Sequence, residues 1–423
     1  MSLLGKVFNR NNKSIFVQIA SYRDPELVPT VKDLFANADH PLDLRVVIAW
    51  QHSQDENIDE IKYIPGVEVI DIDYTKSKGV CWARNKINQK YEGEKYTLQI
   101  DSHSRFIEGW DTKLIQMYNQ VKTVKNKVIL STYPSSYNPD NDPQERDLSN
   151  YSPKFNTHTK EGIPTFAPVS ILNSKDLSKP FLSRSLSAGF IFTEGEFIEK
   201  VPYDPNIYFE GEEISLSVRA FTHGYDIYCP HELVIWHYYI RDNHYKHWDD
   251  NPEWKGIKSV SLERVRKLLG IDGKVCTPCM QKSMGIYYLG KERSKREYEE
   301  FTGFHFESRG VDPYTIEGNL PPNPIVENFD KQFLTEGSWG IQIHRELIEN
   351  QSDSFDFITL ILQDENKYDV HRIDFDPQFI DIILGDKNEI LNINGSYIGR
   401  PWKYWVLWPY KNKWLNKLEG VKS

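Results

Sequence analysis

The strongest chemical signal in the sequence is an aspartate and a histidine that directly follow an apolar run. Residues 96–100, YTLQI, have the composition of a buried strand, and Asp101 and His103 follow them in the segment QIDSHSRF. Protein interiors avoid a carboxylate and an imidazole unless these groups are paired or hold a ligand. Side chains two positions apart on an extended chain point to the same side, so the two residues could share a divalent cation. In the structural alternative, Asp101 caps a turn and His103 bonds a backbone carbonyl.

Other polar residues lie where they could complete such a site. Arg84 and Asn85, in GVCWARNKI, fall on the first turns of the helix that leads into this strand, where they could hold a phosphate or a sugar. His237 ends the apolar run of IWHYY and is a candidate third metal ligand. The structural alternatives are a surface salt bridge for Arg84 and a hydrogen-bonded strand-end residue for His237. His244 and His247 are reserve candidates for metal ligands.

The elements that must position these residues alternate between apolar runs and amphipathic segments. The expected strands are 14–20, 44–50, 67–74, 96–100 and 127–133, and the expected helices are one capped by Asp24, one over 79–91 and one over 110–122. Strands that alternate with helices predict an α/β fold with a mostly parallel sheet between helices. Ligands of such sheets bind beyond the carboxyl ends of the strands, which is where Asp101 and His103 lie.

The middle of the chain is less regular. Residues 134–187 are rich in Pro, Ser, Asn and Asp, so we expect a long loop there. An amphipathic helix is expected from the GEE motif at 211–213 to Gly224, followed by two short strands. A further amphipathic helix that ends in glycine is expected over residues 261–270.

A stretch rich in proline and asparagine at 316–329 indicates a domain boundary. Beyond it, short apolar runs alternate with turn signals such as NING, which is typical of β structure. We therefore expect two domains: an α/β domain over residues 1–315 and a small β-rich accessory domain over residues 325–423.

Composition and charge exclude several classes of protein. The chain has 423 residues, a formal net charge of −10 and 39% hydrophobic residues, as expected for a globular protein of two or three domains. The negative charge argues against nucleic acid or an anionic membrane surface as partner. Residues 1–14 resemble neither a signal peptide nor a transmembrane segment, so we expect a cytoplasmic protein.

Cys276 and Cys279 supply only two of the four ligands that zinc requires. Nothing in the sequence indicates an oligomeric state.

Five motifs, taken in order, resemble a known family. They are VQIASYRDPELVPTVKDL, GVCWARN, QIDSHSRF, GEEISLSVRAFTHGYDIYCP and IWHYY. They are similar to the GlcNAc-transferase family typified by the eukaryotic Skp1 polypeptide α-N-acetylglucosaminyltransferase, and more distantly to the mucin-type polypeptide GalNAc-transferases. The resemblance covers roughly residues 14–270. It implies a GT-A fold, the Rossmann-like fold of nucleotide-diphospho-sugar transferases, with UDP-GlcNAc as donor, Mn2+ or Mg2+ as cofactor and retention of anomeric configuration.

The resemblance also implies roles for residues of this chain. Asp101 and His103 stand at the metal-binding Asp-x-Asp or Asp-x-His motif of the family, and His237 stands where a late histidine completes the metal site. The residues implied to bind the donor are Ser21, Arg23, Arg84, Asn85 and Asp101.

Glu212 and Glu213 occupy the place where related transferases have acidic residues against the donor sugar or the acceptor hydroxyl, so they are the expected catalytic residues. Glu210 is a nearby competitor. The structural alternative for these three is a charge cluster at a helix N-terminus, which complements the helix dipole. The eukaryotic family members act on hydroxyproline, but no residue of this chain fixes that acceptor.

The resulting expectation is a metal-dependent retaining glycosyltransferase that moves GlcNAc from UDP-GlcNAc to a hydroxyl group of a protein or glycan. One alternative is a GT-A transferase that uses another UDP-sugar in capsule or surface-glycan synthesis. Another is a non-catalytic carbohydrate-binding protein in which Trp402, Trp405 and Trp408 stack on glycans, although WKYWVLWPY is more typical of a β-core stripe.

Overall fold

The computed structural model describes most of the chain. The described residues are 14–171, 177–240, 244–274, 276–333, 336–344, 358–363, 369–375, 390–398, 403–410 and 413–421. Within these ranges, no helix has both the length and the apolar character needed to cross a membrane. All four cysteines are free thiols. One of the short apolar runs expected to form β structure, FIDIIL at 379–384, lies outside the described residues, as does Trp402.

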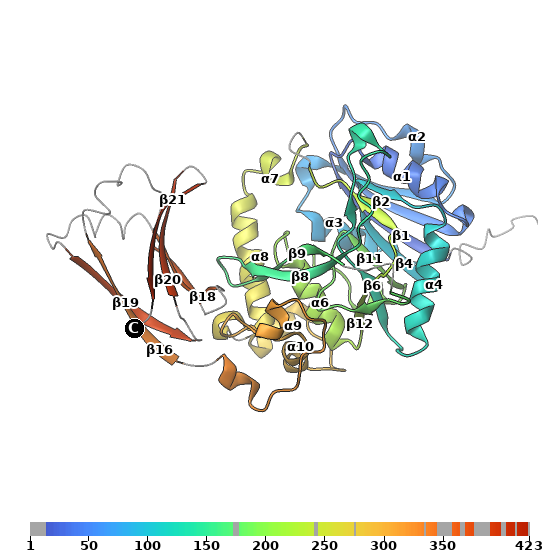
Figure 1. The fold of residues 1–423 in the computed structure, drawn as a ribbon. Coiled ribbons are helices and arrows are strands. Elements are labelled where there is room, and N and C mark those ends of the chain that lie inside the picture. Colours follow the sequence, from blue (N-terminus) through green and yellow to red (C-terminus); the bar gives the residue numbers. More distant parts are fainter. Residues whose placement is uncertain are drawn as a thin grey trace, which may run out of the picture.

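An eight-stranded sheet forms the centre of the fold (Figure 1). Its strands are β1 (Ile15–Tyr22), β2 (Leu44–His52), β3 (Val67–Asp73), β4 (Tyr96–Asp101), β6 (Val128–Ser131), β10 (Phe181–Leu182), β11 (Phe190–Glu194) and β12 (Asp226–Cys229). They lie in the order β10-β12-β6-β11-β4-β1-β2-β3. Four of its seven strand pairs are parallel, in line with the predicted mostly parallel sheet, whereas β11 runs antiparallel to both β4 and β6, and β10 runs antiparallel to β12.

Helices cover both faces of this sheet because its strands are apolar on both faces. The described α-helices are α1 (Leu27–Ala36), α2 (Asp59–Lys62), α3 (Val80–Asn88), α4 (Trp110–Lys122), α5 (Phe197–Lys200), α6 (Glu212–Thr222), α7 (His247–Asp250), α8 (Trp254–Leu269), α9 (Pro278–Met284), α10 (Lys295–Thr302) and α11 (Pro313–Ile316). On β1, Ile15 and Val17 belong to the cluster that α1 and α4 cover, and Phe16 belongs to the cluster that α3 covers. This confirms the predicted α/β layering.

A second, small sheet stands at the carboxyl end of β4. It has the order β5-β13-β7, with β5 over Ser104–Phe106, β13 over Ile235–His237 and β7 over Ser135–Ser136. β13 is antiparallel to β5, and their register sets His237 opposite Ser104. This pairing brings the end of β13 to the end of β4, although the two segments are far apart in the sequence.

Three expectations about local structure need correction. The expected loop over 134–187 contains a hairpin of β8 (Tyr151–His158) and β9 (Pro164–Ser170), whose alternating pattern is obscured by prolines at strand positions. Helix α1 begins at Leu27 and not directly after Asp24, although Asp24 Oδ1 accepts a hydrogen bond of 3.0 Å from the Glu26 backbone N–H in the turn that leads into the helix. Helix α8 begins before the expected residue 261 and ends at Leu269, where Gly270 adopts a left-handed conformation.

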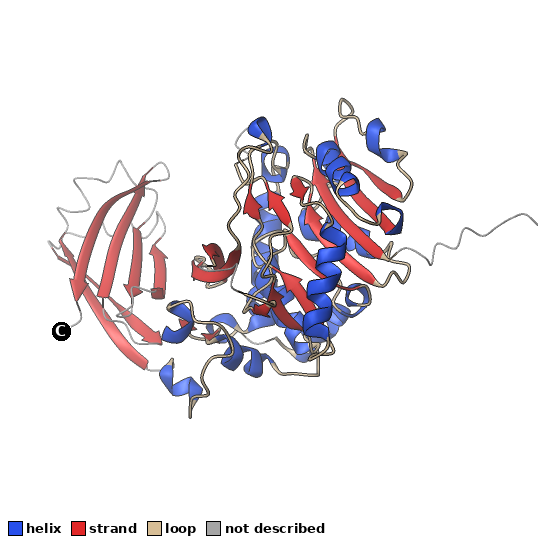
Figure 2. Ribbon diagram, turned by 45° about the vertical axis from the view of Figure 1, so that its right-hand side comes forward, coloured by secondary structure: helices blue, strands red, loops and turns tan. Residues whose placement is uncertain are grey.

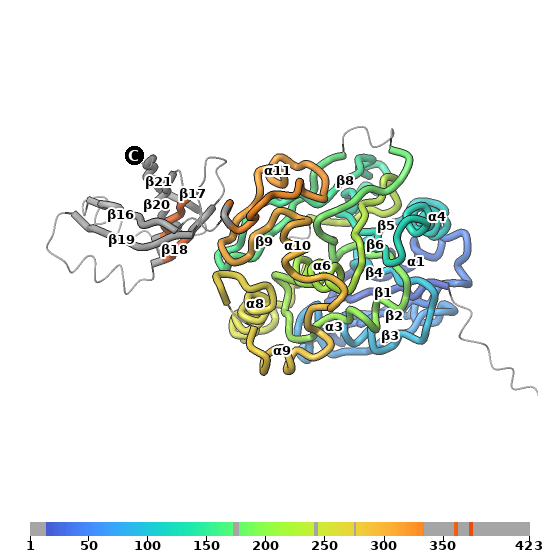
Figure 3. The backbone as a smooth tube through the Cα atoms, turned by 90° about the horizontal axis from the view of Figure 1, so that it is seen from below, coloured from blue at the N-terminus to red at the C-terminus, as the bar shows by residue number. Residues whose placement is uncertain are grey.

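The C-terminal part of the chain forms small sheets that lie beside the main body (Figures 2 and 3), past α8 (Figure 1). β16 (Glu336–His344) pairs with β19 (Ile390–Ile398), and β18 (Asp369–Phe375), β17 (Ile358–Gln363), β20 (Lys403–Tyr410) and β21 (Lys413–Val421) form an antiparallel sheet in that order. A two-stranded sheet, β14 (Phe304–His305) with β15 (Gly310–Val311), belongs to the main body, since Phe304 and Val311 lie in its hydrophobic core. The expected turn NING was wrong, because its residues pair with β16 inside β19. The division into two domains stays a prediction.

Candidate active site

The described residues contain one cluster that could hold a metal ion, and it unites Asp101, His103 and His237. One ligand atom from each of them lies within 4.8 Å of the others. The Nε2 atoms of the two histidines are 2.9 Å apart, and His237 Nε2 is 3.1 Å from Asp101 Oδ2. Asp101 ends β4, His103 follows it, and β13 delivers His237. One carboxylate and two imidazoles are donors that suit a divalent first-row metal ion.

Asp24, which the sequence analysis treated only as a helix cap, holds the His103 ring in place. Its Oδ2 is 2.6 Å from His103 Nδ1 and accepts a second hydrogen bond, of 2.7 Å, from Ser102 Oγ. Burial alone would raise the pKa of the Asp24 carboxyl, but its hydrogen bond with His103 and the charge of that ring hold the pKa well below its usual range. A carboxylate on Nδ1 leaves Nε2 facing the cluster, as at many metal-binding histidines.

Arg84 joins the metal cluster to the acidic residues of α6. Its Nη2 donates a hydrogen bond of 2.8 Å to Asp101 Oδ1, and its Nη1 contacts the Glu212 carboxylate. Burial would raise the pKa of Asp101, but the hydrogen bond with His237 and the positive charge of Arg84 hold that pKa far below its usual range. Asp101 is therefore ionised at any ordinary pH. The guanidinium is buried and engaged by two carboxylates, so it is not the surface salt bridge of the structural alternative.

Glu212 is buried and Glu213 is half-buried, so they do not form an exposed charge cluster. Glu213 accepts hydrogen bonds from the Ala188 backbone N–H at 2.9 Å and from the Tyr133 hydroxyl at 2.7 Å. Burial raises the pKa of Glu213 to about 7, and it raises the pKa of Glu212 against the opposing charge of Arg84. Shifted carboxyl groups inside a cleft are typical of functional sites.

These residues line one cavity of about 460 Å³, a size typical of small-molecule sites. Its wall includes Asp24, Arg84, Asp101, His103, Gly189, Glu210, Glu212, Glu213 and His237. Gly189 is close to the cluster, since a Cβ atom on it would lie 3.2 Å from Asp101 Oδ2. Any side chain at this position would crowd the carboxylate.

Other predicted site residues lie near the cavity without lining it. Among the described residues of β1 and the turn after it, Ala20, Tyr22 and Asp24 line the cavity, whereas Ser21 and Arg23 do not. Arg23 Nη1 instead binds Asp250 at 2.9 Å.

Asn85, on the predicted donor-side helix, does not line the cavity. Its side-chain amide donates a hydrogen bond of 2.7 Å to the Tyr203 backbone carbonyl. His247 lines the cavity, but its Nδ1 is 2.6 Å from the Tyr208 hydroxyl and it does not belong to the metal cluster; neither does His244.

The family model for glycosyltransferase (GlcNAc) matches residues 14–63 and 57–308 of the chain. These matches span well over half of its length, so the chain belongs to the glycosyltransferase (GlcNAc) family. This confirms the class of enzyme and the GT-A fold that the motifs implied. No curated protein matches the chain.

Several solved structures resemble the fold. A structure of GalNAc-T7 with UDP, GalNAc and Mn2+ is 16% identical, with 68% of this chain and 54% of that chain covered and a TM-score of 0.47. The chain therefore spans about half the length of that protein. A structure of S. aureus TarS in complex with UDP-GlcNAc is 14% identical, with 65% of this chain and 80% of that chain covered and a TM-score of 0.37. At these scores the likenesses carry no argument about substrate or metal.

Proposed function

We propose that the protein is a metal-dependent, retaining glycosyltransferase that moves GlcNAc from UDP-GlcNAc to a hydroxyl group of a protein or glycan. The observation that carries the proposal is the convergence of Asp101, His103 and His237, with ligand atoms within 4.8 Å of one another, on the wall of a cavity that Glu212 and Glu213 also line. Membership of the GlcNAc family supports the choice of sugar.

Asp101, His103 and His237 would hold Mn2+ or Mg2+, which supplies a Lewis acid for the leaving diphosphate when it is bound. The chain prepares this site in two ways. Asp24 fixes the ring of His103 at 2.6 Å, and Arg84 keeps Asp101 ionised from 2.8 Å. Partners that hold the metal ligands in place contribute to the preorganisation that electrostatic catalysis requires.

We assign retention of configuration to attack by the acceptor on the same face from which UDP departs. In this step the acceptor oxygen bonds to the anomeric carbon, the bond from that carbon to the diphosphate oxygen breaks with its electron pair, and the acceptor proton leaves with UDP. Glu212 is bound to Arg84, and both carboxylate oxygens of Glu213 already accept hydrogen bonds. These contacts favour a role in positioning the sugar over a covalent role for either residue.

The test is release of UDP from UDP-GlcNAc, UDP-GalNAc and UDP-Glc, with Mn2+ and with EDTA, in the presence of peptide and glycan acceptors. We expect release to depend on Mn2+ and to favour UDP-GlcNAc. His103→Ala should abolish release while the circular dichroism spectrum persists. His231→Ala removes a buried histidine that does not line the cavity, and it serves as the control. Metal-independent release, or preference for another donor, would contradict the proposal.

A further inference from the structure

Two aromatic side chains stand at the cavity with much of their surface in solvent. Phe209 is 52% exposed and Trp248 is 38% exposed, although both line the cavity that holds the metal cluster. Their ring centroids are 6.0 Å apart and their planes are inclined by 62°. Phe209 precedes α6 and Trp248 lies in α7, so separate segments build one aromatic edge, which we name the Phe209–Trp248 edge. Exposed apolar surface at a groove is typical of a ligand-binding place.

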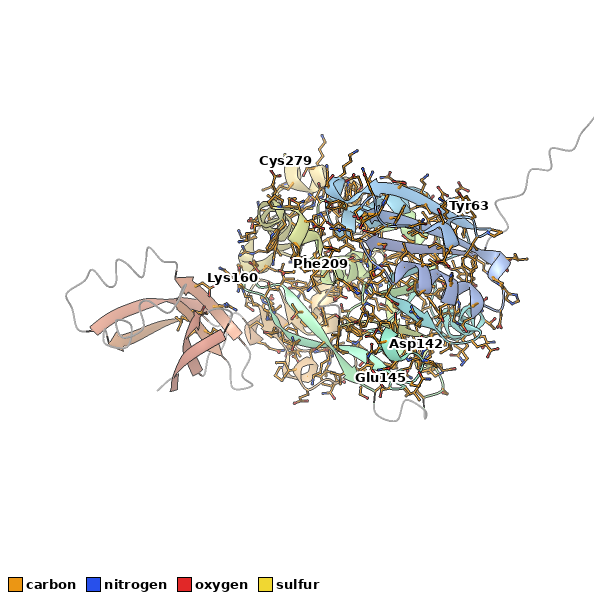
Figure 4. All side chains as sticks on the ribbon, turned by 90° about the horizontal axis from the view of Figure 1, so that it is seen from above. Tyr63, Asp142, Glu145, Lys160, Phe209 and Cys279 are labelled. Atoms are coloured by element: carbon orange, nitrogen blue, oxygen red, sulfur yellow. The ribbon has the colours of Figure 1, made fainter. Side chains whose placement is uncertain are left out.

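The Phe209–Trp248 edge is directly connected to the residues proposed for chemistry. Glu210 and Gly211 follow Phe209 in the chain, and Glu212 comes next at the start of α6; all of them line the cavity. Figure 4 labels Phe209 within the main body of the molecule. A ligand that covers Phe209 from solvent would therefore reach toward the buried end of the cavity along α6.

The charge of the cavity limits what that ligand can be. Its lining carries five carboxyl side chains, Asp24, Asp101, Glu210, Glu212 and Glu213, against the two permanently cationic side chains Arg84 and Lys246. Arg84 is already bound by two of these carboxylates. Under the proposed function, the divalent ion balances the charge of the donor diphosphate. An acceptor with phosphate or carboxylate groups of its own would bring further negative charge beside the remaining carboxylates, whereas hydroxyl groups can donate hydrogen bonds to the same oxygens.

We propose that the acceptor is a neutral glycan, one of whose pyranose rings lies on the Phe209–Trp248 edge; this inference rests on the proposed function. A pyranose has an apolar face of C–H bonds and a rim of hydroxyl groups. The electron-rich face of an aromatic ring attracts polarised C–H bonds, and carboxylates accept hydrogen bonds from the hydroxyl rim. One hydroxyl group of the acceptor then receives GlcNAc: its oxygen bonds to the anomeric carbon, and its proton leaves with UDP.

Matched substitutions separate stacking on a ring from general apolar contact. Phe209→Leu keeps apolar volume but removes the aromatic face, whereas Phe209→Tyr keeps the face. We expect Phe209→Leu and Trp248→Leu to raise the KM for a neutral oligosaccharide acceptor about tenfold, and Phe209→Tyr to stay within about twofold of the wild type. Tyr63→Leu is the control, because Tyr63 is 79% exposed and lies away from the cavity (Figure 4).

The acceptor panel for the wild-type protein contains neutral oligosaccharides, hydroxylated peptides and polyol phosphates. We expect the highest kcat/KM with a neutral oligosaccharide. Preference for a peptide or a polyol phosphate overturns the inference and leaves the proposed function intact. Equal acceptor KM values for Phe209→Leu and Phe209→Tyr overturn the role of the aromatic edge. Failure of the wild type to release UDP with any donor, acceptor and ion refutes the proposed function, and the inference with it.

Discussion

At the scale of single residues, Asp24 shows how a side chain outside the metal cluster sets its geometry. The carboxylate lies 2.6 Å from His103 Nδ1 and is itself held by the Ser102 hydroxyl and the Glu26 backbone N–H. Such partners fix the tautomer and the orientation of a metal-binding imidazole. The sequence indicated Asp24 only as a helix cap, because β1 and β4 are neighbours only in the folded sheet.

Replacing Asp24 by asparagine should weaken metal binding more than folding. We expect Asp24→Asn to lower the affinity for Mn2+ by about 10–100-fold, because His103 loses its charged partner. Titration of Mn2+ by calorimetry measures the change. Asp111→Asn is the matched control, since Asp111 is a buried carboxylate that binds the backbone N–H groups of Asp39 and His40. An Asp24→Asn affinity within twofold of the wild type would show that Asp24 does not position the ligand.

Glu213 gives the protein a pH-dependent stability. Burial raises its pKa from an ordinary 4.5 to about 7 in the folded state, so its contribution to stability is complete below about pH 4.5 and is lost as the pH rises through about 7. Glu213→Gln cannot ionise. We therefore expect its free energy of unfolding, relative to the wild type, to rise by about 3 kcal/mol between pH 5 and pH 8.5. Urea unfolding in EDTA at both pH values measures it, and a difference independent of pH would contradict the assignment.

At the scale of elements, Arg84 connects a helix, a strand and a second helix. It lies on α3, binds Asp101 at the end of β4 and contacts Glu212 at the start of α6. Removing one member of a buried ionic group leaves the others uncompensated, which costs about 3–5 kcal/mol. We expect Arg84→Met to lower the free energy of unfolding by that amount.

Chemical denaturation tests this prediction, and the Arg84→Met/Glu212→Gln double variant should recover part of the loss. The control is Lys200→Met, because Lys200 pairs with Glu196 at 2.9 Å on the surface, where such a pair contributes less than about 1 kcal/mol. A cost for Arg84→Met no larger than for the control would show that the guanidinium does not join these elements.

Local pattern was sufficient to predict some elements and insufficient for others. The continuous apolar run at the start of β1 and the helical spacing of the apolar residues in α6 identified both elements. A strand buried on two faces and a helix buried along one stripe have different periodicities. The β8–β9 hairpin was missed because Pro153, Pro164 and Pro168 obscure its alternation. Asp101, His103 and His237 could be nominated from strand ends, but the pairing of β13 with β5 that unites them is a long-range contact without a local signal.

At the scale of the whole molecule, the eight-stranded sheet and the cavity lie within residues 14–333, and the C-terminal sheets lie beyond them (Figure 1). One described contact between the two parts is an ion pair of 3.1 Å from Lys160, in the β8–β9 turn, to Asp374 on β18. The Lys160 side chain is largely exposed, so this pair contributes about 1 kcal/mol or less.

A chain that ends at residue 333 should therefore fold and keep the donor site. We expect its thermal midpoint to lie within a few degrees of the corresponding transition of the full chain, and its affinity for UDP in the presence of Mn2+ to be unchanged. Differential scanning calorimetry and titration calorimetry measure the two quantities. Aggregation of the shortened chain, or loss of UDP binding, would contradict the proposed two-domain division.

The central claim is that one divalent ion binds between the carboxyl end of β4 and the end of β13. The most direct measurement is an anomalous difference map from a crystal soaked with Mn2+ and UDP. We expect one strong peak about 2.0–2.4 Å from a carboxylate oxygen of Asp101 and from Nε2 of His103 and His237, in contact with the diphosphate. A nucleotide bound in the cavity with no peak at these three side chains, or with manganese held by other residues, would contradict it.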